Sequence, residues 1–263
     1  MLELALLLVG NLDRWILAFF RVGAMLAWAP ALGHRSIPVA HRVGLATLLA
    51  VIVLPAVKSD LGPGAQGPVP WVLAIAGEVL IGLAIAFVAR VVIGAVEVAG
   101  EMIGLEMGFS IATVFDPSLG VQETIVSRFL QQLALVAFLT ANGHHLLIRA
   151  VGGSFQRIAL GSAIDPAQAG GLAALGGKLI QSGCSLAAPV VAVLLVVNVG
   201  LALMGRIAPQ TNIFVVGLPL GIGLGLFALA ETLPGFVQGV GRLVAEIPAD
   251  IDTLVIGARH GLR

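Results

Sequence analysis

Three long stretches of this sequence contain no Asp, Glu, Lys or Arg, and they are residues 129–148, 179–205 and 207–230. A helix needs about 20 predominantly apolar residues to cross a hydrocarbon core about 30 Å thick, so each stretch is long enough. Four weaker apolar segments are interrupted by charges, and they cover residues 4–33, 39–57, 71–89 and 91–115. The pattern predicts an all-α, polytopic membrane-associated chain with about six to seven long helices.

The charge content excludes several classes of protein. Of the 263 residues, 59% are hydrophobic and only 11% are charged, where a soluble domain carries roughly 25% charged residues. The 14 basic residues equal the 14 acidic ones, so no basic excess favours nucleic-acid binding. The single cysteine, Cys184, excludes an internal disulfide and any multi-cysteine metal site. We interpret it as a buried thiol.

No composition shift or internal repeat divides the chain, so we predict one domain over residues 1–263. Met1, Leu2 and Glu3 lack the positive charge of a signal peptide, so we expect the first apolar segment to be retained. Clustered Gly and Pro predict a loop at 58–70, and a second break is predicted at 107–120. Two helix starts are predicted from Ser36-Ile37-Pro38 and Asp165-Pro166.

One predicted helix face combines small and ionisable residues within about 80° of arc. These residues are Arg90, Gly94, Glu97, Glu101, Gly104 and Gly108. Charges at the bilayer centre cost about 3 kcal/mol each, so this face is expected to contact protein or water instead of acyl chains. The series Gly100, Gly104 and Gly108 allows close helix approach, and Gly217, Gly221 and Gly225 repeat that spacing.

Three roles for the acidic residues of this face stay open. Glu97 and Glu101 can form a structural network with Arg90 or with a partner's cation. They can instead relay protons or coordinate a substrate, or they can line an aqueous lumen.

Enzyme and cofactor motifs fail on inspection. Gly176-Gly177-Lys178 lacks the flanking residues of a phosphate loop. The glycine run 221–226 lacks the last glycine of a dinucleotide fingerprint and is interpreted as helix packing. His144 and His145 are neighbours that point about 100° apart on a helix, so they cannot both reach one metal. We expect no catalytic residue, no metal and no cofactor.

Bulky apolar residues precede a helix breaker in Met107 to Pro117, with the sequence MGFSIATVFDP. Because hydrophobic constrictions close pores by excluding water, this segment is a candidate for pore closure. The alternative is an ordinary helix end packed in a core.

Four separated blocks in one order resemble the FliR family of type III export-gate proteins, which also holds the T subunit of virulence secretion systems. The resemblance covers roughly residues 10–240, and its blocks are 21–46, 100–117 (GEMIGLEMGFSIATVFDP), 138–161 (FLTANGHHLLIRAVGGSFQRIALG) and 206–217 (RIAPQTNIFVVG). The last block looks more flagellar than virulence-type. Ala159 stands where the family pattern has proline after Ser154-Phe155, so this turn departs from the family pattern.

The resemblance implies a non-catalytic component of a flagellar export gate in the bacterial inner (cell) membrane, at the basal body. Helical hairpins would assemble with FliP and FliQ around a pore for unfolded flagellar subunits, and would work with FlhB and FlhA. The plug-like loop of the family matches Met107 to Pro117, which gives these closure candidates: Met107, Phe109, Ile111, Val114 and Phe115. The subunit-interface candidates are Arg90, Gly94, Glu97, Gly100, Glu101, Gly104, Gly108, Arg206, Gln210 and Asn212.

Two other functions compete with this reading. A secondary transporter for a small solute would use midplane polar groups such as Glu97 and Glu101, but its usual paired halves are not evident. A purely structural scaffold would make no contact with a lumen.

Overall fold

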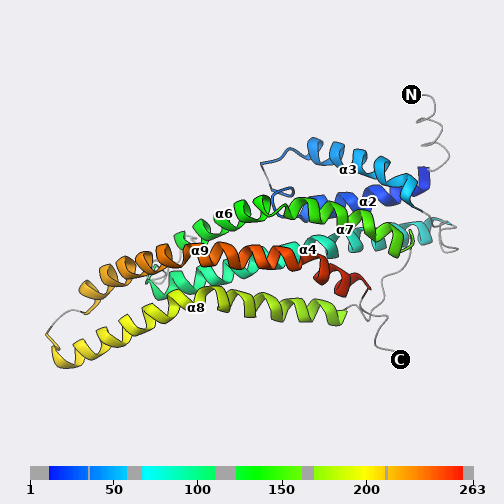
Figure 1. Ribbon diagram of the computed structural model, residues 1–263. Coiled ribbons are helices and arrows are strands. Elements are labelled where there is room, and N and C mark those ends of the chain that lie inside the picture. The colour runs from blue at the N-terminus through cyan, green and yellow to red at the C-terminus, as the bar shows by residue number, and fades with distance from the viewer. Residues whose placement is uncertain are drawn as a thin grey trace. The chain divides into compact units, whose positions relative to one another are not determined.

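A computed structural model describes residues 12–34, 36–57, 67–109, 123–161, 169–210 and 213–256. These residues form seven α-helices and one short 3-10 helix (Figure 1), with no strand in the same ranges. The elements are α2 (Leu12–Trp28), α3 (Val39–Val53), η1 (Leu54–Ala56), α4 (Pro68–Glu106), α6 (Ile125–Thr140), α7 (Gly143–Arg157), α8 (Ala169–Ile207) and α9 (Ile213–Ile256). The predicted all-α class is confirmed.

The predicted segment 71–89 and the part of the predicted segment 91–115 up to Glu106 form one continuous helix, α4. Residues 110–115 lie outside the described residues. Arg90 interrupts the run of apolar residues, but the helix continues through it, because arginine is a good helix former. The predicted loop at 58–70 overlaps the first turn of α4, which begins at Pro68. Residues 58–66 of that loop and the predicted cap at Asp165-Pro166 lie outside the described residues.

The apolar stretch 129–148, predicted as one spanning helix, contains a break. Helices α6 and α7 meet at an angle of 61°. Asn142, the N-cap residue of α7, has a left-handed backbone conformation with φ 57°. Asparagine tolerates this conformation better than most residues, so the chain can turn at Asn142, directly before Gly143.

Two smaller predictions are wrong. Ser36 does not cap α3, whose N-cap residue is Pro38 with no side-chain cap bond. The Ser36 hydroxyl oxygen instead lies 2.8 Å from His34 Nδ1. Cys184 is exposed, and it lies on α8, much of whose surface is not buried within the chain.

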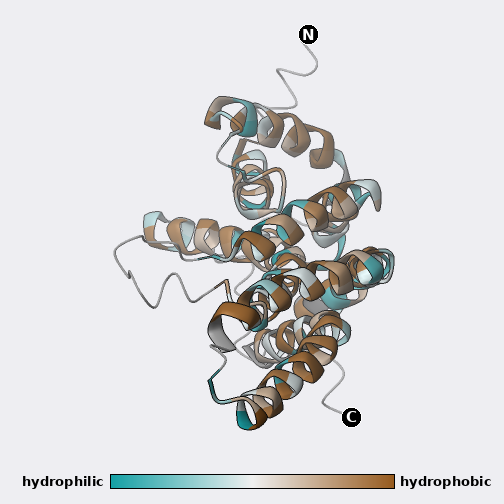
Figure 2. Ribbon diagram, turned by 90° about the vertical axis from the view of Figure 1, so that its left-hand side faces the viewer, coloured by the Kyte–Doolittle hydropathy of each residue, from teal (hydrophilic) through white to brown (hydrophobic). Residues whose placement is uncertain are grey.

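Three helices are long and apolar enough to cross a membrane, judged by length and composition, or up to four if the bent pair α6 and α7 counts as one span. The three lie within α4, α8 and α9. Hydrophobic residues, drawn in brown, make up much of the helical ribbon (Figure 2). In α4, 56% of an 18-residue apolar stretch is buried within the chain. The corresponding buried share is 17% in α8 and 22% in α9. Helices α8 and α9 therefore carry large apolar faces that this chain does not cover.

The chain forms two compact units. The first comprises residues 1–90, 142–175 and 245–263, and its buried residues include Leu17 and Met25. In it α2 packs against α3, where a Cβ atom added at Gly23 would lie 3.9 Å from Ala46 Cβ. The second comprises residues 91–141 and 176–244, with a core that includes Ile103, Leu130 and Phe138. The three long helices contribute residues to both units.

Candidate functional site

In the second unit, the predicted glycine ladder of α4 packs against the start of α6. A Cβ atom added at Gly100 would lie 2.4 Å from Ser127 Cα, and one at Gly104 would lie 2.4 Å from Thr124 Oγ1. Neither position can hold a side chain without displacing α6. The predicted close approach is confirmed, and the helix that approaches belongs to the same chain.

Glu101 completes this contact by capping α6. Its Oε1 accepts the backbone N–H of Thr124 at 2.9 Å, and Thr124 Oγ1 accepts the N–H of Ser127 at 3.1 Å. Two amides at the helix start thus gain acceptors, and the carboxylate lies where the helix dipole favours a negative charge. Of the open roles for Glu101, this geometry favours the structural network, with Thr124 as its partner.

Helix α4 ends in a Schellman motif centred on Gly108. The Gly108 N–H donates to the Leu105 carbonyl and the Phe109 N–H donates to the Gly104 carbonyl, both at 3.0 Å. Gly108 has φ 86°, a conformation that favours glycine. The predicted position of Gly108 on the face of Gly100 and Gly104 is therefore wrong, because the helix has already ended at Glu106.

Met107 is 1% exposed and lies against α9. A Cβ atom added at Gly225 would lie 2.6 Å from Met107 Cγ, and one at Gly221 would lie 3.6 Å from the Met107 carbonyl oxygen. The second glycine series therefore admits the end of α4, in agreement with its interpretation as helix packing. Next to it, Asn198 Nδ2 of α8 donates to Glu106 Oε2 at 2.9 Å.

The five closure candidates have different surroundings. Met107 lies in the core of the second unit, whereas Phe109 is half-buried just past the end of α4. Ile111, Val114 and Phe115, with most of the predicted break at 107–120, lie outside the described residues. The closure role stays a prediction. The burial of Met107 agrees with the alternative interpretation, in which this segment is an ordinary helix end packed in a core.

The remaining interface candidates differ in exposure. Gly94 faces α8 of this chain, since an added Cβ would lie 2.9 Å from Leu179 Cδ1. Arg90, Glu97, Arg206 and Gln210 are exposed, and Asn212 lies outside the described residues. In the first unit, Arg90 Nε donates to the Trp28 carbonyl oxygen at 3.0 Å. Their interface role stays a prediction.

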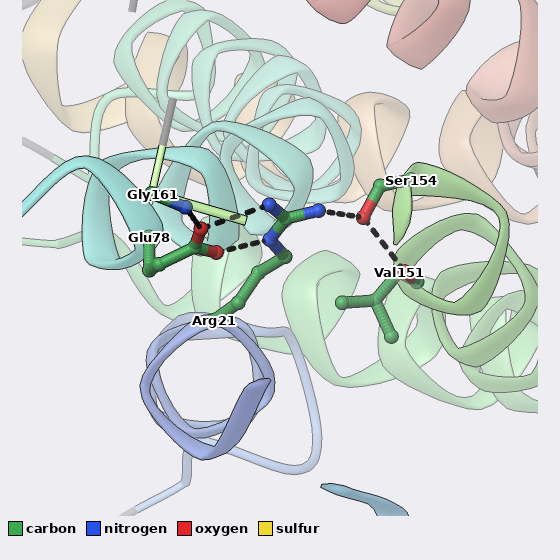
Figure 3. Close-up of polar contacts among 5 residues, drawn as sticks. All are labelled: Arg21, Glu78, Val151, Ser154 and Gly161. Carbon is green, nitrogen blue, oxygen red and sulfur yellow. Dashed lines mark hydrogen bonds and ion pairs between the residues drawn. The ribbon is translucent and has the colours of Figure 1, made fainter. Parts of the chain in front are cut away.

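Sequence analysis missed a buried ion pair in the first unit between Arg21 of α2 and Glu78 of α4 (Figure 3). Arg21 Nε donates to Glu78 Oε2 at 2.5 Å and Nη2 donates to Oε1 at 3.1 Å, so the contact is bidentate. Both side chains are 0% exposed. The Arg21 guanidinium also lies 4.3 Å from the centre of the Phe155 ring, a cation–π contact.

Three further hydrogen bonds complete this network. Arg21 Nη1 donates to Ser154 Oγ at 3.0 Å, and Ser154 Oγ donates to the Val151 carbonyl at 2.7 Å. Glu78 Oε1 accepts the Gly161 N–H at 2.8 Å. The network therefore joins α2, α4, α7 and the turn after α7 (Figure 3). A bidentate pair with these extra partners meets the conditions under which buried charges are tolerated.

The backbones of α2 and α4 lie close together beside this network. A Cβ atom added at Gly82 would lie 2.2 Å from the Arg21 carbonyl oxygen. The only sequence signal was that Arg21 and Glu78 each interrupt an apolar segment. Nothing in their separation of 57 positions indicates a pair.

No group of three or more His, Cys, Asp or Glu side chains within the described ranges could hold a metal ion. The rings of His144 and His145 lie 4.2 Å apart between centroids. His144 Nδ1 is buried without a hydrogen-bond partner.

Long apolar helices and a buried, hydrogen-bonded Arg–Glu pair define an all-helical membrane-associated protein. The family model described as bacterial export proteins, family 1, matches residues 12–247. The chain is 36% identical to the flagellar biosynthetic protein FliR of Bacillus subtilis, over 84% of this chain and 86% of the relative. It is 35% identical to FliR of Escherichia coli over 90% of both chains, and 36% identical to FliR of Caulobacter vibrioides over 84% and 89%.

The chain therefore belongs to family 1 of the bacterial export proteins. It is a component of the flagellar export apparatus.

Proposed function

We propose that this chain is a non-catalytic subunit of the flagellar type III export gate in the bacterial inner membrane. It forms part of the pore for unfolded flagellar subunits together with FliP and FliQ, and works with FlhB and FlhA. The observation that carries this proposal is the match of residues 12–247 to the export family, with flagellar relatives that cover most of the chain.

The uncovered faces of α8 and α9 support membership in a larger assembly. Val196 on α8 is 73% exposed and Phe227 on α9 is 65% exposed. The apolar stretches of these two helices are only 17% and 22% buried within the chain. Exposed apolar surface on this scale marks contact with lipid or with other protein. A pore subunit surrounded by other subunits and lipid has both neighbours.

The anchoring of α4 supports a pore role for the segment that follows it. On one side of residues 110–122, Met107 is held against Gly225. On the other side, Thr124 is bonded to Glu101 and packed against Gly104. Both flanks are thus fixed to the last turns of α4 and to α9, as a pore element needs in order to keep its position.

The same contacts disfavour the alternative of a solute transporter. Such a transporter would use Glu101 to bind its solute or a coupling ion. Glu101 instead accepts the Thr124 amide as part of a helix cap.

A secretion assay tests the proposal. Deletion of the gene should abolish the appearance of hook and filament subunits in the medium, and the wild-type chain supplied from a plasmid should restore it. A secreted protein that uses the general secretory pathway serves as the control and should be unaffected. Unchanged export of flagellar subunits in the deletion strain would overturn the proposal.

A further inference from the structure

A cavity of about 320 Å³ lies between α7 and α9 in the first unit. Its lining includes Arg149, Ala150, Gly153 and Arg157 on α7, and Ile251 and Asp252 on α9. The volume falls at the lower end of the range of small-ligand sites, so the group that fills it has to be small.

The α7 side of this cavity is small and open in its middle. Ala150 and Gly153 lie between Arg149 and Arg157, and their spacing puts all four residues on one face of the helix. A Cβ atom added at Gly153 would meet nothing within 4 Å. Small residues in a helix face allow a second helix to approach closely. A helix that packs here would place a side chain between the two arginines.

The charges around this cavity leave an excess of one positive charge. Arg157 Nη1 forms an ion pair with Asp252 Oδ1. Arg149, eight positions earlier on the same helix, makes no ion pair or hydrogen bond with any described residue. All three side chains are exposed, so a group from outside the chain can reach them.

A carboxylate fits this arrangement. It carries one negative charge, which equals the excess of the cavity, and its two oxygens accept paired hydrogen bonds from one guanidinium group. Ala150 and Ile251 offer apolar contact to the methylene carbons of an acidic side chain.

The source of the carboxylate follows from the open face of α7. A free anion needs no room for a backbone, whereas a helix needs the space that Ala150 and Gly153 leave. Only 11% of the residues of this chain are charged, so an arginine without a counter-charge is an unusual group for it to display. Subunit interfaces pair such a positive group with a negative one on the other protein.

We propose that this cavity receives an acidic side chain from a helix of a neighbouring subunit, with its carboxylate bound by Arg149 beside the pair of Arg157 and Asp252. This proposal rests on the proposed function, because it needs an assembly with other proteins. It adds an interaction surface on α7 and α9 and states the chemistry of the group that docks there.

Zero-length cross-linking tests the contact in the assembled complex. Arg149→Lys keeps the positive charge and supplies a primary amine, which a carbodiimide joins to a touching carboxylate as an amide with loss of water. The full-length variant is purified together with FliP and FliQ, treated with the reagent and digested for mass spectrometry. We expect a cross-link from position 149 to an Asp or Glu of another subunit. Arg149→Gln has no amine and should lack this cross-link, while cross-links from the native lysines remain.

Two neighbouring glycines separate loss of the contact from damage to the helix. Gly153→Leu fills the cavity and should lower the recovery of the other subunits about tenfold, as should the charge reversal Arg149→Glu. Gly152→Leu adds the same side chain one position away, at a site that is open but not part of the lining. Its recovery should stay within about twofold of the wild type. Thermal unfolding of the variants checks that each is folded.

Two results would overturn this proposal while leaving the proposed function in place. The first is an intact complex in which cross-links from position 149 are absent or confined to carboxylates of this chain, Asp252 included. The second is wild-type recovery of the other subunits by both Arg149→Glu and Gly153→Leu. Failure of the wild-type chain to co-purify with any other subunit would overturn the proposal and the proposed function together.

Discussion

In the first unit, the pair Arg21–Glu78 and the pair Arg157–Asp252 lie in opposite surroundings. Arg21 and Glu78 are 0% exposed, and the pair makes further bonds to Ser154 and Gly161. Arg157 and Asp252 are 51% and 52% exposed. The same two kinds of group therefore meet once in an apolar core and once at the surface.

This difference leads us to expect that burial determines how much each ion pair contributes to the stability of the chain. A buried charge that loses its partner is strongly destabilising, whereas exposed pairs contribute little because water and salt screen them. Glu101 is intermediate: it is half-buried and its partner is a backbone amide. These three carboxylates form a series of burial, and the predictions below test whether stability follows it.

The largest effect is expected for Glu78→Leu. It leaves the Arg21 guanidinium buried without its counter-charge, which should lower the free energy of unfolding by about 3–5 kcal/mol. Thermal unfolding of the detergent-solubilised chain measures the loss. The double variant Arg21→Met, Glu78→Leu removes both charges and should recover much of it. A single variant as stable as the wild type would show that the buried pair is not needed.

Met107→Ala tests a buried apolar contact of the second unit for comparison. Removing a fully buried methionine side chain should cost about 2–5 kcal/mol, because a cavity forms beside Gly225. Met204→Ala is the matched control, since Met204 is 56% exposed on α8. Equal losses in the two variants would contradict the burial of Met107.

Thr124→Ala is expected to have an intermediate effect. It removes the hydroxyl that caps the Ser127 amide and should cost about 0.5–2 kcal/mol. Thr253→Ala is the control, because Thr253 is exposed and its hydroxyl donates to the Ala249 carbonyl in its own helix. Urea or thermal unfolding compares the two, and a larger loss in Thr253→Ala would contradict the capping role.

The smallest effect is expected for the exposed pair. Asp252→Asn should change the free energy of unfolding by about 0–1 kcal/mol, and high salt should reduce the difference further. A double-mutant cycle with Arg157→Gln isolates the coupling between the two side chains. If the coupling free energy between Arg157 and Asp252 were as large as that between Arg21 and Glu78, the contribution of an ion pair would not depend on its burial, and our interpretation would be wrong.

Hydropathy and spacing predicted much of the fold but not its long-range polar contacts. Apolar runs indicated the long helices, and the glycine spacing indicated the close approach at Gly100 and Gly104. The spacing could not say that the approaching helix, α6, lies in the same chain. The break after α6 was missed because Asn142 adopts a left-handed conformation inside an uncharged run.

The buried network shows the same limit. Arg21, Glu78, Ser154 and Gly161 come from separate parts of the sequence, and no local periodicity links them. An isolated charge in an apolar helix predicts that a partner exists. Which residue is the partner depends on the packing of three helices, which a single sequence does not specify.

The central claim is that this chain is completed by other subunits of the export gate. Affinity purification of the full-length chain from membranes that also contain FliP and FliQ, followed by mass measurement of the extracted complex, tests this most directly. The account predicts one discrete assembly in which all three proteins are present in a fixed ratio. Recovery of the chain as a stable, separate monomer, with FliP and FliQ in other fractions, would contradict it.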